Sequence, residues 1–354
     1  MRTRAGFLLV VLAWAARGEY TRPAPDVIEV ANGIYCFMSK PYGDVGLDGN
    51  SVAIVTDEGV LVFDANGTPA ASAAVLTELR KRTDKPVRFV VYSHWHWDHW
   101  YGAETYTRAF PDVRVIAHEK ARALMLGPAI EFNRPGLEQQ LPAYVASIEK
   151  KAEADPASRP LADEDRFFLE QKRHARLVLP TVTYSDRLTL HLGSREIQLL
   201  HYDRAVTPGD TLLFLPAEKI VISGDLLVNP IAFALSSYPT GWLVSLERVE
   251  ALAPSLIIPG HGKPLHDLTL LRAHMQAMRI MLAAGADARI RGLDADQAKD
   301  EVLLKLRGEM LTMTGDDPTL NSLFRTYLVD WYMHRVYDEL SGPMTDAISP
   351  IPGK

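Results

Sequence analysis

Three histidines and an aspartate lie close together in the segment Ser93-His94-Trp95-His96-Trp97-Asp98-His99, in a chain of 354 residues that has only 11 histidines. Imidazole nitrogen and carboxylate oxygen are common protein ligands of zinc. His94 and His96 are two positions apart and project alike on an extended backbone. Asp98 and His99 follow where the loop can turn. The segment could therefore serve two neighbouring metal ions.

The residues before this loop predict how it is positioned. The run 87–92 is short, β-branched and aromatic, which predicts a buried strand. Ligand sites in α/β folds tend to lie at the carboxyl ends of strands. Two more predicted strands end in candidate ligands, Asp225 after Ser223-Gly224 and His261 within Pro259-Gly260-His261-Gly262. The glycines beside His261 allow a close approach of the backbone.

The rest of the chain alternates between strand and helix patterns. Short apolar runs bounded by turn residues predict strands over 27–30, 34–38, 51–55, 60–63, 87–92, 113–117, 188–192, 196–201, 211–215, 220–223 and 255–259. Helical spacing predicts helices over 70–82, 101–110, 137–152, 162–176, 242–252, 268–284, 294–307 and 319–340. The order predicts an α/β fold of two half-domains, whose sheets pack face to face with helices outside.

Two helical regions extend this pattern. Residues 118–176 have little strand character and are too long for a bare loop, which predicts a helical insertion. The insertion is either a lid over the His-rich loop or a solvated decoration. Residues 266–354 predict a C-terminal helical extension, with Asp294 and either Asp316 or Asp317 as N-caps. An apolar stripe on its last helix predicts a core or subunit contact, and the oligomeric state stays open.

The composition and the amino-terminal residues limit which classes of protein this chain can belong to. The formal net charge of −6 gives no basic face for nucleic acid. Residues 1–18 have a basic start, a short apolar run and small residues for cleavage, which predicts a signal peptide. The mature protein would be periplasmic or secreted, without a stable membrane span. A buried N-terminal helix or an uncleaved anchor is the alternative. The one cysteine, Cys36, predicts a buried thiol in a strand.

The motifs together resemble the metallo-β-lactamase-fold hydrolases. The resemblance rests on His94-x-His96-x-Asp98-His99, Gly224-Asp225 and Gly260-His261, in order over residues 27–265. It implies an αββα sandwich as the main domain, residues 19–265, with metals at the edge of its two sheets. It also implies that His94 and His96 bind the first metal, and Asp98, His99 and His261 the second. Asp225 would bridge the two ions.

One position departs from the family pattern. The family has a further histidine for the first metal, in a segment like Gly-x-x-His-Thr-x-Gly-Asp. Here Thr207, Gly209 and Asp210 match this segment, whereas Val206 holds the histidine position and cannot ligate. Three alternatives stay open. The first metal binds with three ligands and lower affinity, only the second site fills, or catalysis is lost. His201, a few residues upstream, could also turn in as a replacement ligand.

The predicted function is metal-dependent hydrolysis of an ester, lactone, thioester or amide in a small-molecule substrate. One or two Zn²⁺ ions would lower the pKa of bound water from 15.7 toward about 7 and so make hydroxide at neutral pH. Iron or manganese is not excluded. Asp98 and Asp225 would orient that hydroxide and move its proton. The alternatives are a mononuclear iron oxygenase resembling the persulfide dioxygenases, and a binding protein without catalysis.

Overall fold

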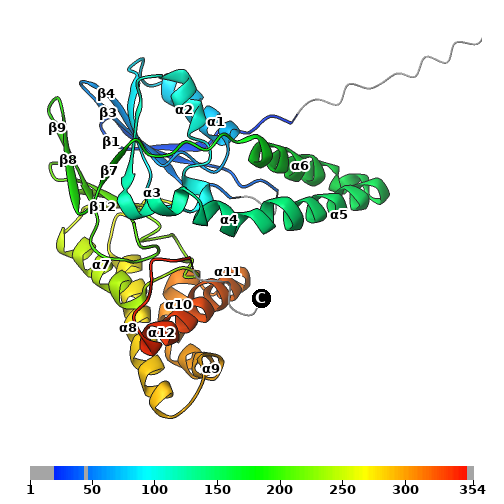
Figure 1. The fold of residues 1–354 in the computed structure, drawn as a ribbon, viewed down its shortest axis with the longest axis vertical. Coiled ribbons are helices and arrows are strands. Elements are labelled where there is room, and N and C mark those ends of the chain that lie inside the picture. The colour runs from blue at the N-terminus through cyan, green and yellow to red at the C-terminus, as the bar shows by residue number, and fades with distance from the viewer. Residues whose placement is uncertain (1–19, 44–46, 349–354) are drawn as a thin grey trace, which may run out of the picture.

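The computed structural model describes residues 20–43 and 47–348, so the predicted signal peptide lies outside the described residues. Two β-sheets pack face to face and carry helices on their outer faces (Figure 1). This arrangement confirms the αββα sandwich predicted from the sequence. Within the described part of the chain, no helix is both long enough and apolar enough to cross a membrane.

The first sheet has seven strands, paired in chain order from β1 to β7. Its strands are β1 (Asp26–Ala31), β2 (Ile34–Met38), β3 (Ser51–Thr56), β4 (Gly59–Phe63), β5 (Val87–Val91), β6 (Arg114–His118) and β7 (Val182–Tyr184). The pairs from β1 to β4 are antiparallel, and the pairs from β4 to β7 are parallel. The parallel strands β4 and β5 therefore end at the same edge of the sheet.

The second sheet has five strands in the order β12-β11-β10-β9-β8. Its strands are β8 (Arg187–Leu192), β9 (Arg195–Leu200), β10 (Leu212–Leu215), β11 (Ile220–Gly224) and β12 (Leu256–Pro259). Only β11 and β12 run parallel, so the residues that follow these two strands also meet at one edge.

Alternating apolar residues divide the interior into three clusters. Leu61 and Phe63 of β4 face the cluster between the sheets, whereas Val62 faces the outer helices of the first sheet. This period of two is typical of a strand that is buried on both faces. Cys36 is buried in β2 as predicted, and burial raises the pKa of its thiol to about 12.

The helices lie in the connections between strands and in the C-terminal region. They are α1 (Pro69–Arg80), α2 (Glu104–Ala109), α3 (Glu119–Met125), α4 (Pro128–Pro135), α5 (Leu141–Ala154), α6 (Arg159–His174), α7 (Pro239–Ala251), α8 (Thr269–Ile290), α9 (Ala295–Lys305), α10 (Arg307–Thr314), α11 (Pro318–Leu323) and α12 (Trp331–Ser341). The sequence patterns missed β7, α3, α4 and α10, which are short. The predicted helix over 319–340 is α11, a π-helical turn and α12.

The predicted insertion forms α3 to α6, between β6 and β7 (Figure 1). Pro128, Pro142 and Pro160 lie in the first turn of α4, α5 and α6. Proline is favoured there because its missing N–H would have no intrahelical partner. Pro128 therefore begins α4, whereas α5 and α6 continue directly from a π-helical turn (Gly136–Gln140) and a 3₁₀ turn (Pro156–Ser158).

The C-terminal helices α8 to α12 share one apolar cluster with α7 and the outer face of the second sheet. The apolar stripe predicted on the last helix is partly core, since Phe324, Leu328 and Val336 are buried. Asp294 and Asp317 cap α9 and α11 as predicted. The extension thus covers the second sheet, as the insertion helix α3 and helices α1 and α2 cover the first.

Candidate metal centre

The predicted site residues meet at one edge of the two sheets. The His-rich loop leaves β5 and ends in a 3₁₀ turn at Trp97–His99, while Asp225 follows β11 and His261 follows β12. They form two groups, each with ligand atoms within 4.8 Å of one another: His94, His96 and Asp225 form one, and Asp98, His99 and His261 the other. We call these groups the first and the second half of the site.

The second half has the spacing of a closed coordination shell. Asp98 Oδ2 lies 3.2 Å from His99 Nε2 and 3.1 Å from His261 Nε2. Asp225 Oδ1 lies 3.4 Å from His99 Nε2 and 3.5 Å from His261 Nε2. With metal–ligand distances of about 2.0–2.2 Å, the ligand atoms of a tetrahedral zinc site are about 3.3–3.5 Å apart. Four donors therefore surround one point.

The Asp225 carboxylate spans the two halves. Its Oδ1 faces the second half, whereas its Oδ2 lies 3.8 Å from His94 Nε2 in the first half. Among the described residues, His94 Nε2, His99 Nε2 and Asp225 Oδ1 are buried without a hydrogen-bond partner. Leaving such groups unpaired costs about 1–3 kcal/mol each. Since these atoms face one another, the donor set fits metal ions.

One ring nitrogen of each loop histidine contacts a protein oxygen. His94 Nδ1 lies 2.8 Å from Ser93 Oγ, and His99 Nδ1 lies 2.8 Å from Asp64 Oδ2. His96 Nε2 lies 3.1 Å from Ser236 Oγ. Such outer partners fix the orientation and tautomer of metal-binding histidines.

The sequence reasoning missed two of these outer partners, Asp64 and Ser236. Asp64 was detectable in principle, because it directly follows the predicted strand 60–63, which is parallel to the strand before the His-rich loop. Ser236 lies in an irregular segment between Asp225 and α7 and gave no such signal.

Electrostatics differ between the halves. Although burial opposes it, Asp98 and Asp225 raise the pKa of His99 well above its usual value and that of His261 to about 10. Burial instead lowers the pKa of His94 well below its usual value and that of His96 to about 4. The second half therefore pairs carboxylates with protonated imidazoles, whereas the first half presents neutral imidazoles.

Glycines allow the backbone to approach the site, as predicted for Gly260. A Cβ atom on Gly260 would lie 2.0 Å from Asp225 Oδ1, and one on Gly49 would lie 2.5 Å from His99 Cε1. Real Cβ atoms do not come this close to other atoms. Any larger residue at Gly260 or Gly49 would therefore displace Asp225 or His99 from its present position.

The Val206 side chain is buried in the apolar cluster of the second sheet and offers no ligand atom. Its segment is held by Asp210, whose carboxylate accepts bonds from the backbone N–H and the hydroxyl of Thr207. Among the described residues, His201 belongs to neither half of the site. Its Nδ1 lies 2.8 Å from the carbonyl oxygen of Asp210, and its ring packs on His118 with centroids 4.0 Å apart.

The insertion reaches the His-rich loop through α6. Lys172 Nζ lies 3.6 Å from the centre of the Trp97 ring and 4.0 Å from that of Tyr101. Burial lowers the pKa of Lys172 well below its usual value, against the opposing charges of Asp98 and Asp48. Trp95 is buried and Phe168 packs against Trp97, so the insertion covers the loop.

A cavity of about 340 Å³ opens between the insertion and the loop. Most of its lining is apolar or aromatic, and the amino group of Lys172 lies among these side chains. It is lined by Trp97, Tyr101, Asn133, Gly136, Leu137, Gln140, Leu141, Tyr144, Phe168 and Lys172. Trp97, which lines this cavity, directly precedes Asp98 of the metal centre in the chain.

Comparisons with known proteins agree with this geometry. A sequence profile of the metallo-beta-lactamase superfamily matches residues 44–261. A linear primary-alkylsulfatase of a Pseudomonas species is 24% identical over 271 residues, which are 72% of this chain and 49% of that protein. The chain therefore spans about half the length of this curated relative.

Solved structures share the fold. A metallo-beta-lactamase from Pontibacter korlensis is 18% identical with a TM-score of 0.52, covering 72% of this chain and 99% of its own. A double mutant of the sec-alkyl sulfatase PisA1 is 16% identical with a TM-score of 0.61. That match covers 93% of this chain and 52% of the sulfatase, so it extends into the C-terminal helices.

Proposed function

Because this chain belongs to the metallo-β-lactamase superfamily, we propose that it is a metal-dependent hydrolase that acts on a small molecule. The observation that carries the proposal is the position of Asp225, whose two carboxylate oxygens face the two halves of the site. His94 and His96 would hold one ion, Asp98, His99 and His261 a second, and Asp225 would contact both.

Bound Zn²⁺ would supply Lewis acidity and a water of lowered pKa. The residues of this chain would transfer protons and limit the access of bulk water to the site. Asp98 and Asp225, which are buried beside the histidines, would accept and pass on protons at their carboxylate oxygens. Trp97 and the insertion would exclude bulk water from one side of the site.

The bond that is cleaved belongs to an ester, lactone, thioester or amide in our proposal. Among esters we place linear alkyl sulfates first, because the curated relative named above is a linear primary-alkylsulfatase. The apolar cavity between Trp97 and α5 supports a substrate with an apolar chain. The reacting group would lie at the metals and the chain beyond Trp97.

Metal analysis of the purified protein, followed by a substrate panel, tests the proposal. The panel contains alkyl sulfates, carboxylic esters, lactones, thioesters and a β-lactam. We expect bound zinc and hydrolysis of one class. Bound iron with oxygen uptake on a persulfide would favour the iron oxygenase. No tightly bound metal, and no activity with added Zn²⁺, Mn²⁺ or Fe²⁺, would favour a binding protein.

We also infer that the protein is exported, from the signal-like composition of residues 1–18. Expression of the full chain, followed by cell fractionation and amino-terminal sequencing, tests this. We expect a periplasmic or secreted protein that begins near residue 19. A cytoplasmic protein with an intact amino terminus would contradict export.

A further inference from the structure

The segment 229–238 contacts the first half of the site through Phe233 and Ser236, which both lie against His96. Ser236 is 6% exposed, and its hydroxyl donates a hydrogen bond of 3.0 Å to the carbonyl oxygen of Val206. The same hydroxyl oxygen lies 3.1 Å from His96 Nε2. A serine hydroxyl has one hydrogen, so an oxygen that donates to Val206 accepts from His96.

This chain of bonds fixes the tautomer of His96. The proton lies on Nε2, and the lone pair of Nδ1 remains available as a metal ligand. The family position that holds Val206 thus loses a ligand side chain but keeps a role for its main-chain oxygen. We propose that Ser236 is a positioning residue that presents His96 Nδ1 to the metal, anchored on the Val206 carbonyl. The inference rests on the proposed metal site.

The C-terminal extension holds the segment that carries Ser236. The Ala234 N–H donates to the carbonyl oxygen of Tyr327 at 2.9 Å, and Arg335 Nε donates to that of Ser237 at 2.8 Å. Phe233 packs against Trp331 with ring centres 4.5 Å apart. Contacts with α12 and the turn before it therefore fix the backbone on both sides of Ser236.

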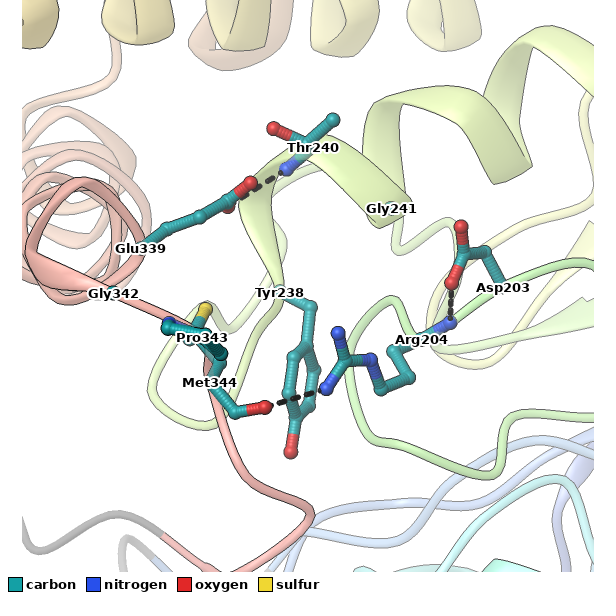
Figure 2. A pocket seen from close by; sticks show the side chains of 9 residues that line it. All are labelled: Asp203, Arg204, Tyr238, Thr240, Gly241, Glu339, Gly342, Pro343 and Met344. Carbon is teal, nitrogen blue, oxygen red and sulfur yellow. Dashed lines mark hydrogen bonds between the residues drawn. The ribbon is translucent and has the colours of Figure 1, made fainter.

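The C-terminal extension also forms hydrogen bonds with the segment that carries Val206 and with the start of α7. Figure 2 shows the pocket of about 350 Å³ where the end of α12 meets residues 203–204 and the start of α7. Arg204 Nη1 donates to the carbonyl oxygen of Met344 at 2.7 Å, and Glu339 accepts from the Thr240 N–H at 3.1 Å. The Tyr238 N–H donates to the carbonyl oxygen of Ala205 at 2.7 Å. The C-terminal extension therefore contacts both the segment that carries Ser236 and the segment that carries Val206.

The first test is ¹⁵N NMR of the histidine rings in metal-free protein, with His96 assigned by its loss in His96→Gln. We expect the Nε2–H tautomer of His96 in the wild type and a mixture of tautomers in Ser236→Ala. Ser236→Thr keeps the hydroxyl and should restore the single tautomer. An unchanged His96 signal in Ser236→Ala would overturn the proposal. This readout needs no metal, so it stands apart from any failure of the proposed function.

The second test is titration of metal-free protein with Zn²⁺. Ser236→Ala should weaken the weaker site by about 10–100-fold, as is usual for loss of an outer partner, and leave the tighter site unchanged. Ser237→Ala is the matched control, because its buried hydroxyl donates only to the carbonyl oxygen of Ala234. It should change neither site. Equal weakening of both sites in Ser236→Ala, or zinc bound to His96 through Nε2, would count against the positioning role.

Discussion

The two halves of the candidate metal centre use the same loop but differ in what lies opposite it. The second half places Asp98, His99, His261 and one Asp225 oxygen at mutual distances of 3.1–3.5 Å where these are measured. The first half has two histidines and the other Asp225 oxygen, at 3.8 Å from His94. The complete His-x-His-x-Asp-His motif of the loop therefore does not make two equal sites.

The supports of the halves differ as well. Asp225 and His261 leave the ends of β11 and β12, where Gly260 lets the strands approach closely. His96 depends instead on Ser236 in an irregular segment that the C-terminal helices hold. The second half is thus built from the sandwich itself, and the first half needs the extension.

The largest expected effect comes from removing one ligand of each half in turn. His261→Ala should abolish tight metal binding and lower activity by more than about 100-fold, the upper end of the cost of losing a ligand's outer partner. His94→Ala should leave one tight equivalent of metal. Metal content by mass spectrometry, measured together with rates, checks both. Tight metal in His261→Ala and none in His94→Ala would reverse the ranking of the halves.

Zinc titration should next show one tight and one weak equivalent in the wild type, because Val206 offers no ligand. Val206→His should raise the stoichiometry toward two, because it supplies a ligand nitrogen at the position where the family pattern has a histidine. Val206→Leu adds bulk without a ligand and should leave the stoichiometry unchanged. Two tight equivalents in the wild type, or no gain in the histidine variant, would contradict the assignment of this segment.

A smaller effect should separate substrate choice from metal binding. Leu141→Trp fills the cavity under α5 and should lower kcat/KM for long-chain substrates by about 10-fold or more, while short-chain substrates change little. Metal content should stay at the wild-type level. Ser147→Trp places the same side chain on the same helix outside the cavity. Equal losses for all chain lengths would show that the cavity does not receive the chain.

The smallest expected effect is on the pH dependence of stability, through His274 in the C-terminal extension that contacts the segment carrying Ser236. Burial in α8 lowers the pKa of His274 to about 4, below its value of about 6.5 in an unfolded chain. Its contribution to stability is present above pH 6.5 and is lost as the pH falls through 4. When the pH falls from 7 to 5, the free energy of unfolding should therefore decrease by about 2 kcal/mol less in His274→Gln than in the wild type. Urea unfolding at both pH values measures this difference, and equal losses would contradict it.

The sandwich was predictable because its strands follow local patterns, whereas the roles of the candidate ligands were named from the resemblance to a family. Runs such as 220–223 and 255–259 identify buried strands, and Asp225 and His261 meet because the strands they follow, β11 and β12, are parallel neighbours. Of the outer partners, Asp64 was detectable from the strand that it follows. Ser236 was not, since it meets His96 only after distant segments fold together. Lys172 was hidden for the same reason, because the helix that carries it gives no sign of the aromatic rings that it contacts.

The place of the insertion in the sheet has a consequence for how this protein can change. Strands β6 and β7 are parallel neighbours, so the chain between them must return across the face of the sheet, which takes a dozen residues or more. Residues 119–181 are that return path, lengthened into α3 to α6. A deletion within α3 to α6 must leave one helix to cross from β6 to β7. The other helices of this connection can be lengthened, shortened or exchanged without altering either strand. Substrate range can therefore evolve in this connection while the metal ligands, which lie on other strands, stay fixed.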